Sequence, residues 1–263
     1  MIDSLILKIK RGETPFYRWL RDFAKRTLSG TLPLPRFVNP LLGALYHFHF
    51  AVRFAIWRTW IYLWAEPLFR GRCSSVGKRL QLWHMPEVNG HVKVFLGDDV
   101  TIFGKIGIYS ARVYDEPKLI IKNHVGIGHG VNFVVNKEII VEEDVHMATG
   151  VRVMDSDAHP RDTDERIAGL PPSPEDIKPV RIGRGSWIGQ NTFIMKGVTI
   201  GEGAVVGVNS VVINDIPPFV TAMGNPARVV SPPWPGKNKT ANTSADTSTK
   251  PAAPSPVNVN ASA

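Results

Sequence analysis

One histidine lies among carboxylates in a segment whose residue types suit proton transfer. His159 follows Asp155 and Asp157 in the stretch MDSDAHPRD. An imidazole with a pKa of about 6.5 suits general base catalysis near neutral pH. Asp157, two residues earlier, would lie on the same side of an extended chain and could hold the imidazole Nδ1. The candidate catalytic group is therefore His159, Asp157 and Asp155, with His159 as the base.

A purely structural interpretation of the same residues stays open. His159 could be an ordinary loop residue, and carboxylates in surface loops commonly cap turns or remain solvated. Asp162 and Arg166 are four residues apart and could pair to hold the loop. We assign these two no catalytic role.

The elements that must position this group repeat every six residues. Between Val153 and Ile182 the repeat skips 29 residues, and His159 lies in that interruption. A period of six places successive residues about 240° apart on a helix, so no helical stripe forms. Short strands joined by corners fit the period, with three strands in each coil of 18 residues and about five coils in total. The apolar ladder positions are Leu96, Ile102, Ile108, Ile121, Ile127, Phe133, Val141, Met147, Val153, Ile182, Ile188, Ile194, Ile200, Val206 and Val212.

This ladder, together with two motifs, resembles the left-handed β-helix acyltransferases with hexapeptide repeats, and more closely their galactoside, maltose and exopolysaccharide O-acetyltransferase branch. The resemblance covers residues 94–230 and is most specific at MDSDAHPRD and in residues 187–228, which read WIGQNTFIMKGVTIGEGAVVGVNSVVINDIPPFVTAMGNPAR. It implies an all-β core built as a left-handed parallel β-helix. It also implies acetyl transfer from acetyl-CoA to a sugar hydroxyl, in a homotrimer whose active sites lie between subunits.

The resemblance further assigns individual residues to the reaction. The family's catalytic histidine, which precedes a proline, matches His159, and its small-residue corners contact the arm of coenzyme A. The cofactor-binding residues implied in this way are Trp187, Gly189, Gly207, Val208 and Arg228. Glycines at β-helix corners and a tryptophan in the wall could equally be structural.

One departure and two alternatives bear on these assignments. Ile213 and Asn214 stand where relatives often carry Thr-Lys, so one cationic phosphate contact is absent. We expect no metal, but the γ-class carbonic anhydrases share this prism and bind zinc through histidines. His124 and His129 match part of that arrangement. The other alternative is a trimeric scaffold without catalysis, in which His159 would be dispensable.

The first 90 residues differ sharply from the rest in composition. They hold 14 of the 31 Lys and Arg residues, 5 of the 23 acidic residues and 15 of the 24 aromatic residues. Basic and aromatic residues together are typical of segments that bind membrane surfaces. Arg53 and Arg58 lie inside the apolar stretch 41–64, and each costs about 2.5 to 3.5 kcal/mol on insertion. We therefore expect residues 1–75 to lie in the interface, as a helix or as a hairpin broken by prolines such as Pro33, with a helical cap on the next domain as the alternative.

These observations divide the chain into three parts. We expect a helical appendage at 1–90, the β-helix domain at 91–230 with an inserted loop at 155–179, and a disordered tail at 231–263 that is rich in Pro, Ala, Ser, Thr and Asn. The charged start predicts a cytoplasmic protein, attached to the inner face of the membrane if residues 1–75 bind lipid. The single cysteine, Cys73, excludes a disulfide scaffold and a multi-thiolate zinc site. No nucleic acid partner is expected, and the acceptor sugar, O- or N-acetylation and acyl length stay open.

Overall fold

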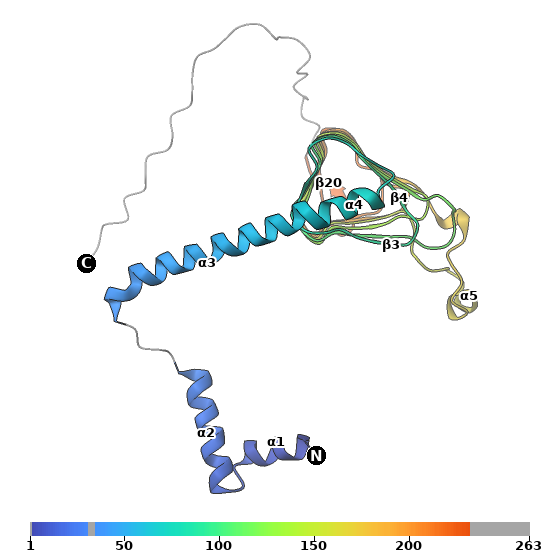
Figure 1. The fold of residues 1–263 in the computed structure, drawn as a ribbon. Helices are drawn as coiled ribbons and strands as arrows, with labels where there is room; N and C mark the ends of the chain where they lie inside the picture. Colours follow the sequence, from blue (N-terminus) through green and yellow to red (C-terminus); the bar gives the residue numbers. More distant parts are fainter. Residues whose placement is uncertain (1, 31–34, 232–263) are drawn as a thin grey trace, which may run out of the picture. The chain divides into compact units, whose positions relative to one another are not determined.

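The structure is a computed structural model that describes residues 2–30 and 35–231 (Figure 1). The chain forms two compact units, residues 1–59 and residues 60–263. The predicted break at Pro33 and the predicted disorder of residues 232–263 lie outside the described residues.

The first unit is helical and leaves its apolar side chains exposed. It contains α1 (Ile2–Arg11), α2 (Pro15–Ser29), the short 3-10 helix η1 (Arg36–Val38) and α3 (Asn39–Trp60). Thr14 begins α2, because its Oγ1 accepts a hydrogen bond from the Tyr17 N–H at 3.2 Å. Phe16, Trp19 and Phe23 stack along one side of α2, and neither α2 nor α3 has a buried residue. Among the described residues, no helix is long and apolar enough to cross a membrane.

The second unit is a three-sided prism of stacked, nearly all-parallel strands (Figure 1). Sheet A contains β1 (Ser75–Val76), β4 (Lys93–Leu96), β7 (Lys118–Ile121), β10 (Glu138–Val141), β13 (Val180–Ile182) and β16 (Thr199–Ile200). Sheet B contains β2 (Gln81–Leu82), β5 (Thr101–Ile102), β8 (Gly126–Ile127), β11 (His146–Met147), β14 (Trp187–Ile188), β17 (Val205–Val206), β19 (Thr221–Gly224) and β20 (Ala227–Val229). Sheet C contains β3 (Glu87–Asn89), β6 (Gly107–Tyr109), β9 (Asn132–Val134), β12 (Arg152–Met154), β15 (Phe193–Ile194) and β18 (Val211–Val212). The chain visits A, B and C in turn, so we name the three edges the A–B, B–C and C–A corners.

The six-residue ladder is the core of the prism. Ile108, Phe133 and Val153 lie directly above one another in sheet C, each fully buried. Because successive strands differ by one coil, each ladder residue packs on its counterparts above and below. The predicted parallel β-helix is confirmed by these pairings.

The prism has one coil more than the sequence analysis assigned to it. Strands β1 to β3 form this first coil through Val76, Leu82 and Val88, inside the segment 1–90 that we expected to be helical. The six-residue spacing is present there, but the step from Val88 to Leu96 is eight residues. Phe133 to Val141 is a step of the same length, so the coil was missed because the composition of residues 1–90 outweighed its spacing.

A helical segment closes the first-coil end of the prism. It consists of the π-helix η2 (Ile61–Ala65) and α4 (Glu66–Arg72), and α4 crosses the triangular end in Figure 1. Ile61, Ala65 and Phe69 are four residues apart, which places them on one helical face, and all three are buried. We call residues 61–72 the cap. The alternative of a packed helical cap therefore holds for this part of the appendage.

Candidate active site

The interruption of the ladder is an excursion from the C–A corner. It leaves the end of β12 at Met154 and returns at the start of β13 at Val180. It contains the short helix α5 (Thr163–Ile167) and the 3-10 turn η3 (Pro174–Asp176). Figure 1 shows this segment standing away from the prism. The excursion can therefore carry side chains that the stacked strands cannot present.

Asp155 anchors the first residues of the excursion from inside the prism. Its carboxylate is fully buried and accepts hydrogen bonds from the backbone N–H groups of Asn136 at 2.8 Å, Lys137 at 2.6 Å and Glu138 at 3.0 Å. Burial raises the pKa of Asp155, while the hydrogen bonds from Lys137 and Asn136 act against that rise. Asp155 therefore holds the turn before β10, and its oxygens are occupied by backbone donors.

The residues before the histidine are fixed by a second set of contacts. Ser156 is fully buried, and its Oγ accepts hydrogen bonds from the Asn136 side chain and from the Ala158 N–H. Ala158 adopts a φ of 64°, a left-handed conformation that non-glycine residues adopt uncommonly. These contacts determine where the chain turns immediately before His159.

His159 lies at the surface between two constrained neighbours. Its side chain is exposed, whereas Pro160 is buried. Among the residues that the structure describes, none forms a hydrogen bond or an ion pair with the His159 imidazole. The ring is thus held at the rim of the excursion with both nitrogens open to a substrate or to another chain.

The structure does not bring Asp157 to His159. The Asp157 carboxylate instead accepts from the Lys196 Nζ at 2.6 Å, and the same ammonium group lies 3.4 Å from Asp176. Arg161 adds an ion pair to Asp176 at 3.2 Å. Lys196 follows the ladder residue Ile194 at the C–A corner, and its side chain is only 12% exposed. Asp157 therefore ties the excursion to the next coil of the prism.

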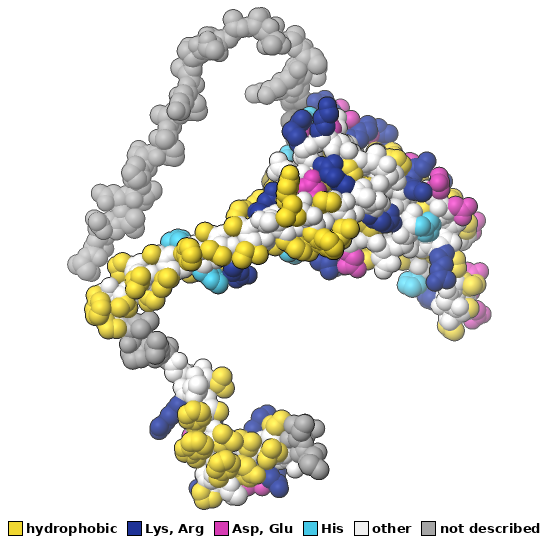
Figure 2. All heavy atoms as spheres, in the orientation of Figure 1, with side chains coloured by type: hydrophobic (Ala, Val, Ile, Leu, Met, Phe, Trp, Pro, Cys, Tyr) yellow, Lys and Arg dark blue, Asp and Glu magenta, His cyan; other side chains and the backbone are white. Residues whose placement is uncertain are grey.

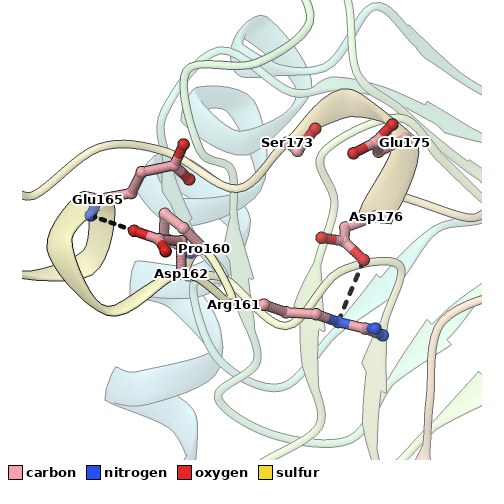
Figure 3. Close-up of a pocket in the computed structure, with 7 residues that line it drawn as sticks. All are labelled: Pro160, Arg161, Asp162, Glu165, Ser173, Glu175 and Asp176. Atoms are coloured by element: carbon pink, nitrogen blue, oxygen red, sulfur yellow. Dashed lines mark hydrogen bonds and ion pairs between the residues drawn. The ribbon is translucent and has the colours of Figure 1, made fainter.

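A cavity of about 470 Å³ opens inside the excursion (Figure 3), and its lining begins at Pro160, the residue that follows His159 in the chain. Four of its lining residues carry carboxylates, and Asp162 Oδ1 caps α5 by accepting from the N–H groups of Asp164 and Glu165 at 2.9 Å. Arg161 contributes a positive charge, and Figure 3 shows it pointing toward Asp176. The lining residues are Pro160, Arg161, Asp162, Glu165, Ser173, Glu175 and Asp176.

A shorter excursion forms a second groove with the first one. It spans residues 110–117, between β6 and β7 at the same C–A corner. Arg112 and Val113 from this segment line a groove of about 400 Å³ together with Glu165 and residues 170–174. Sequence reasoning missed this wall of the site. The sequence does mark this segment, because the successive ladder residues Ile108 and Ile121 are 13 residues apart instead of six.

The predicted cofactor residues lie together at the B–C corner of the last coils. Gly189 and Gly207 directly follow the ladder residues of β14 and β17. A Cβ at Gly189 would lie 2.7 Å from the Val206 carbonyl oxygen, so the next coil leaves no room for a side chain. Trp187 and Val208 are 57% and 63% exposed beside these glycines.

Arg228 lies one step beyond this corner. It is in β20, paired with Met223, and the Met223 side chain faces Gly207. The Arg228 guanidinium donates to the Ala227 carbonyl at 2.9 Å, and the residue is exposed. The B–C corner is built of small residues, and Arg228 lies beyond it. Such a surface could bind an extended chain of amide groups that carries a phosphate at one end.

The histidine corner and the glycine corner are on opposite edges of sheet C. Gly189 marks the B–C corner and Met195 the C–A corner, at the two ends of β15. They are six positions apart in the sequence, so the two corners are up to about 20 Å apart at 3.3 Å per residue. One chain therefore presents the two groups at different edges of its prism.

The two histidines considered for zinc point to different corners. His124 lies at the A–B corner, where its Nδ1 is 3.2 Å from Asp144 and its Nε2 is 3.5 Å from Asp99. His129 precedes Gly130, at the B–C corner. Within residues 2–30 and 35–231 no group of three or more His, Cys, Asp or Glu side chains could hold a metal ion.

Comparisons with known proteins give the family. Residues 179–214 match the family model "Bacterial transferase hexapeptide (six repeats)". Two relatives carry the name "Putative acetyltransferase": YJL218W of Saccharomyces cerevisiae is 36% identical over 122 residues, 46% of this chain, and DDB_G0275913 of Dictyostelium discoideum is 35% identical over 175 residues, 63% of this chain. The matched part covers 57% of the yeast protein and 85% of the Dictyostelium protein.

A solved structure agrees in fold. AntD, an N-acyltransferase from Bacillus cereus in complex with dTDP and 3-hydroxybutyryl-CoA, superposes with a TM-score of 0.51 at 18% identity, over 64% of this chain and 88% of that one. This likeness concerns the fold alone. Because the Dictyostelium relative is matched over most of its length and the ladder builds the whole prism, the chain belongs to the left-handed β-helix, hexapeptide-repeat acyltransferase family.

Proposed function

We propose that this protein transfers an acetyl group from acetyl-CoA to a sugar hydroxyl, with His159 as the general base. The observation that carries the proposal is an exposed imidazole, held by buried contacts at its base, in an excursion that also encloses a cavity of about 470 Å³. Two relatives named as acetyltransferases support the choice of donor. The yeast relative is matched over little more than half its length, so the activity of the whole protein is part of this proposal.

The reaction needs no covalent enzyme intermediate. The acceptor oxygen attacks the thioester carbonyl carbon while an imidazole nitrogen of His159 takes the hydroxyl proton. The tetrahedral intermediate then collapses, the carbon–sulfur bond breaks, and the imidazolium returns the proton to the leaving thiolate. Products are the acetyl ester and free coenzyme A.

The donor would lie along the B–C corner. Gly189 and Gly207 leave the backbone accessible there, so amide groups of the coenzyme A arm can approach it closely. Trp187 and Val208 offer exposed apolar contact, and Arg228 offers a bidentate donor to a phosphate. Ile213 and Asn214 supply no charge, so Arg228 carries more of the phosphate binding than in relatives with Thr-Lys.

A homotrimer would complete the site. The donor corner and His159 lie at opposite edges of sheet C, so within one chain the base is far from the sulfur of a bound donor. Three prisms packed side by side would set the C–A corner of one against the B–C corner of the next. This arrangement supports active sites between subunits.

Asp157 and Asp155 would act by positioning. Asp157 is bound by Lys196, and Asp155 is enclosed by backbone N–H groups, so both hold the excursion that presents His159. A partner for the imidazole Nδ1 would then come from the neighbouring subunit or from the substrate.

We place the reaction in polysaccharide or glycolipid biosynthesis, at the inner face of a membrane. The cavity inside the excursion supplies carboxylates that can accept hydrogen bonds from sugar hydroxyls. Residues 1–75 would bring the protein to the lipid surface as a peripheral attachment, because their exposed aromatic side chains are interspersed with Lys and Arg.

The test compares two histidine variants. We expect His159→Ala to lower kcat for thiol release from acetyl-CoA, in the presence of a glycan panel, by about 10²- to 10⁴-fold with Tm unchanged. His124→Ala is the matched control: it removes an exposed histidine at another corner and should retain full activity.

Two results would contradict the proposal. Full turnover in His159→Ala would favour a scaffold role for the prism. Loss of activity in His124→Ala, together with stoichiometric zinc in the purified protein, would favour a zinc enzyme.

A further inference from the structure

The outer face of the cap is strongly apolar. Tyr62, Leu63 and Trp64 are 69%, 65% and 59% exposed. At about 100° per residue Leu63 lies opposite the buried face of the cap, and Tyr62 and Trp64 lie on its two flanks. Leu68, 45% exposed, is on the flank of Trp64. The inner face of the cap is apolar as well, since Ile61, Ala65 and Phe69 pack on the first coil. A helix on the surface of a water-soluble domain normally presents polar residues outward. Figure 2 shows hydrophobic side chains along this segment, at the end of the prism.

The residue types of this face match a lipid surface. Tyrosine and tryptophan favour the membrane–water interface, where the ring is in apolar surroundings and the polar group remains hydrated. The same two residue types are also enriched in protein–protein interfaces, so the charges around the cap decide between the two kinds of contact.

The charges around the cap are those that attract anionic lipid. Arg72 lies at the end of the cap and Lys78 just after it, and both are exposed. The only acidic residue of the cap, Glu66, is neutralised by Arg70 at 3.0 Å. The preceding helix α3 contains Arg53 and Arg58 and no Asp or Glu. Each basic residue near an anionic surface contributes about 1 kcal/mol of attraction.

We propose that the cap end of the prism docks on an anionic lipid bilayer through Tyr62, Leu63 and Trp64. This docking proposal rests on the membrane contact proposed for residues 1–75. It assigns that contact to the cap, which belongs to the same unit as the prism. The lipid headgroups would surround the aromatic rings, and the basic residues would meet their phosphates.

Docking at this end has a consequence for the acceptor. The excursion with His159 leaves the fourth coil, three strand spacings beyond the first, which is about 14 Å at 4.8 Å per spacing. The reacting hydroxyl would then stand away from the bilayer surface. A glycan attached to a lipid and extending from it meets this condition.

The experiment places a fluorophore on this face in the full-length chain. Cysteine is introduced as Tyr62→Cys or Trp64→Cys in a Cys73→Ser background and labelled with an environment-sensitive dye. The matched control is Ile213→Cys, at an exposed residue of the last coil, at the opposite end of the prism. Phosphatidylcholine vesicles are compared with vesicles that also contain phosphatidylglycerol.

We expect the emission of dye at residues 62 and 64 to rise severalfold and shift to the blue with the anionic vesicles, with no change at residue 213. If the chain floats with vesicles while dye at 62 and 64 is unchanged, the first helical unit alone binds lipid and the proposal is wrong. A change that follows protein concentration without lipid would assign the face to a second copy and would also overturn it. Thiol release with soluble glycans, measured on the same samples, reports separately on the proposed activity.

Discussion

The coils of the prism and the excursion at residues 155–179 are held in place by different kinds of contact. In the coils the same contact repeats: the ladder residues are apolar and buried, and each is stacked on its counterpart in the next coil. In the excursion, individual polar contacts replace the repeat, such as Asp155 with three backbone N–H groups and Asp157 with Lys196. The coils are therefore held by repeated burial, whereas the excursion is held by polar contacts that occur once each.

The largest loss of stability is expected from a change in the core of the prism. Phe133 is fully buried in β9, between Ile108 and Val153 of the adjacent coils. We expect Phe133→Ala to lower the free energy of unfolding by about 3 to 5 kcal/mol, because it leaves a cavity that rigid coils cannot close. Chemical denaturation measures this change.

Phe103 provides the control for that experiment. It follows β5 at the B–C corner and is 57% exposed. Phe103→Ala should change the free energy of unfolding by no more than about 0.5 kcal/mol. Equal losses in the two variants would mean that burial in the ladder is not what stabilises the prism.

The fold was predictable from sequence because the ladder is a local, repeated signal. Each ladder position indicates the same β-helix, so one irregular step does not obscure the prediction. The first coil escaped because Val76, Leu82 and Val88 lie within residues 1–90, whose basic and aromatic composition we took as one helical segment. The excursion was found for the converse reason, since a gap of 29 residues stands out against a regular period.

The contacts within the site were less predictable. His159 could be singled out by its chemistry and its motif, but the partner of Asp157 is Lys196, 39 residues later and on another coil. In the sequence Lys196 is an ordinary polar residue between two repeats. Its pairing depends on how the excursion folds back over the corner, and no periodicity encodes that path.

At the base of the excursion a smaller loss of stability is expected. Asp155→Asn replaces one carboxylate oxygen with an NH₂ group that would face the N–H of Lys137 or Asn136. An unsatisfied buried donor costs about 1 to 3 kcal/mol, so we expect a loss of that size in the free energy of unfolding at neutral pH. Denaturation curves of the two proteins give the difference.

The same variant has a pH signature. Burial raises the pKa of Asp155 in the folded chain above its usual value of 3.8. The folded state then binds this proton more tightly than the unfolded state, so the residue's contribution to stability falls as pH rises from 3.8 through the folded pKa. Asp155→Asn should remove that slope. An unchanged slope would mean that another group titrates in this range.

A smaller loss of stability is expected at Lys196. Lys196→Gln removes one charge that holds Asp157 and Asp176, but Arg161 still pairs with both carboxylates, so the free energy of unfolding should fall by about 1 kcal/mol. If the excursion positions His159, the same change should lower kcat/KM for acetyl transfer about tenfold, because a small displacement of a catalytic group is costly. Lys118→Gln, at an exposed lysine of β7, is the matched control and should leave both quantities unchanged. Full activity in Lys196→Gln would mean that the excursion holds His159 without this tie, and that Asp155 and Ser156 alone fix the position of the base.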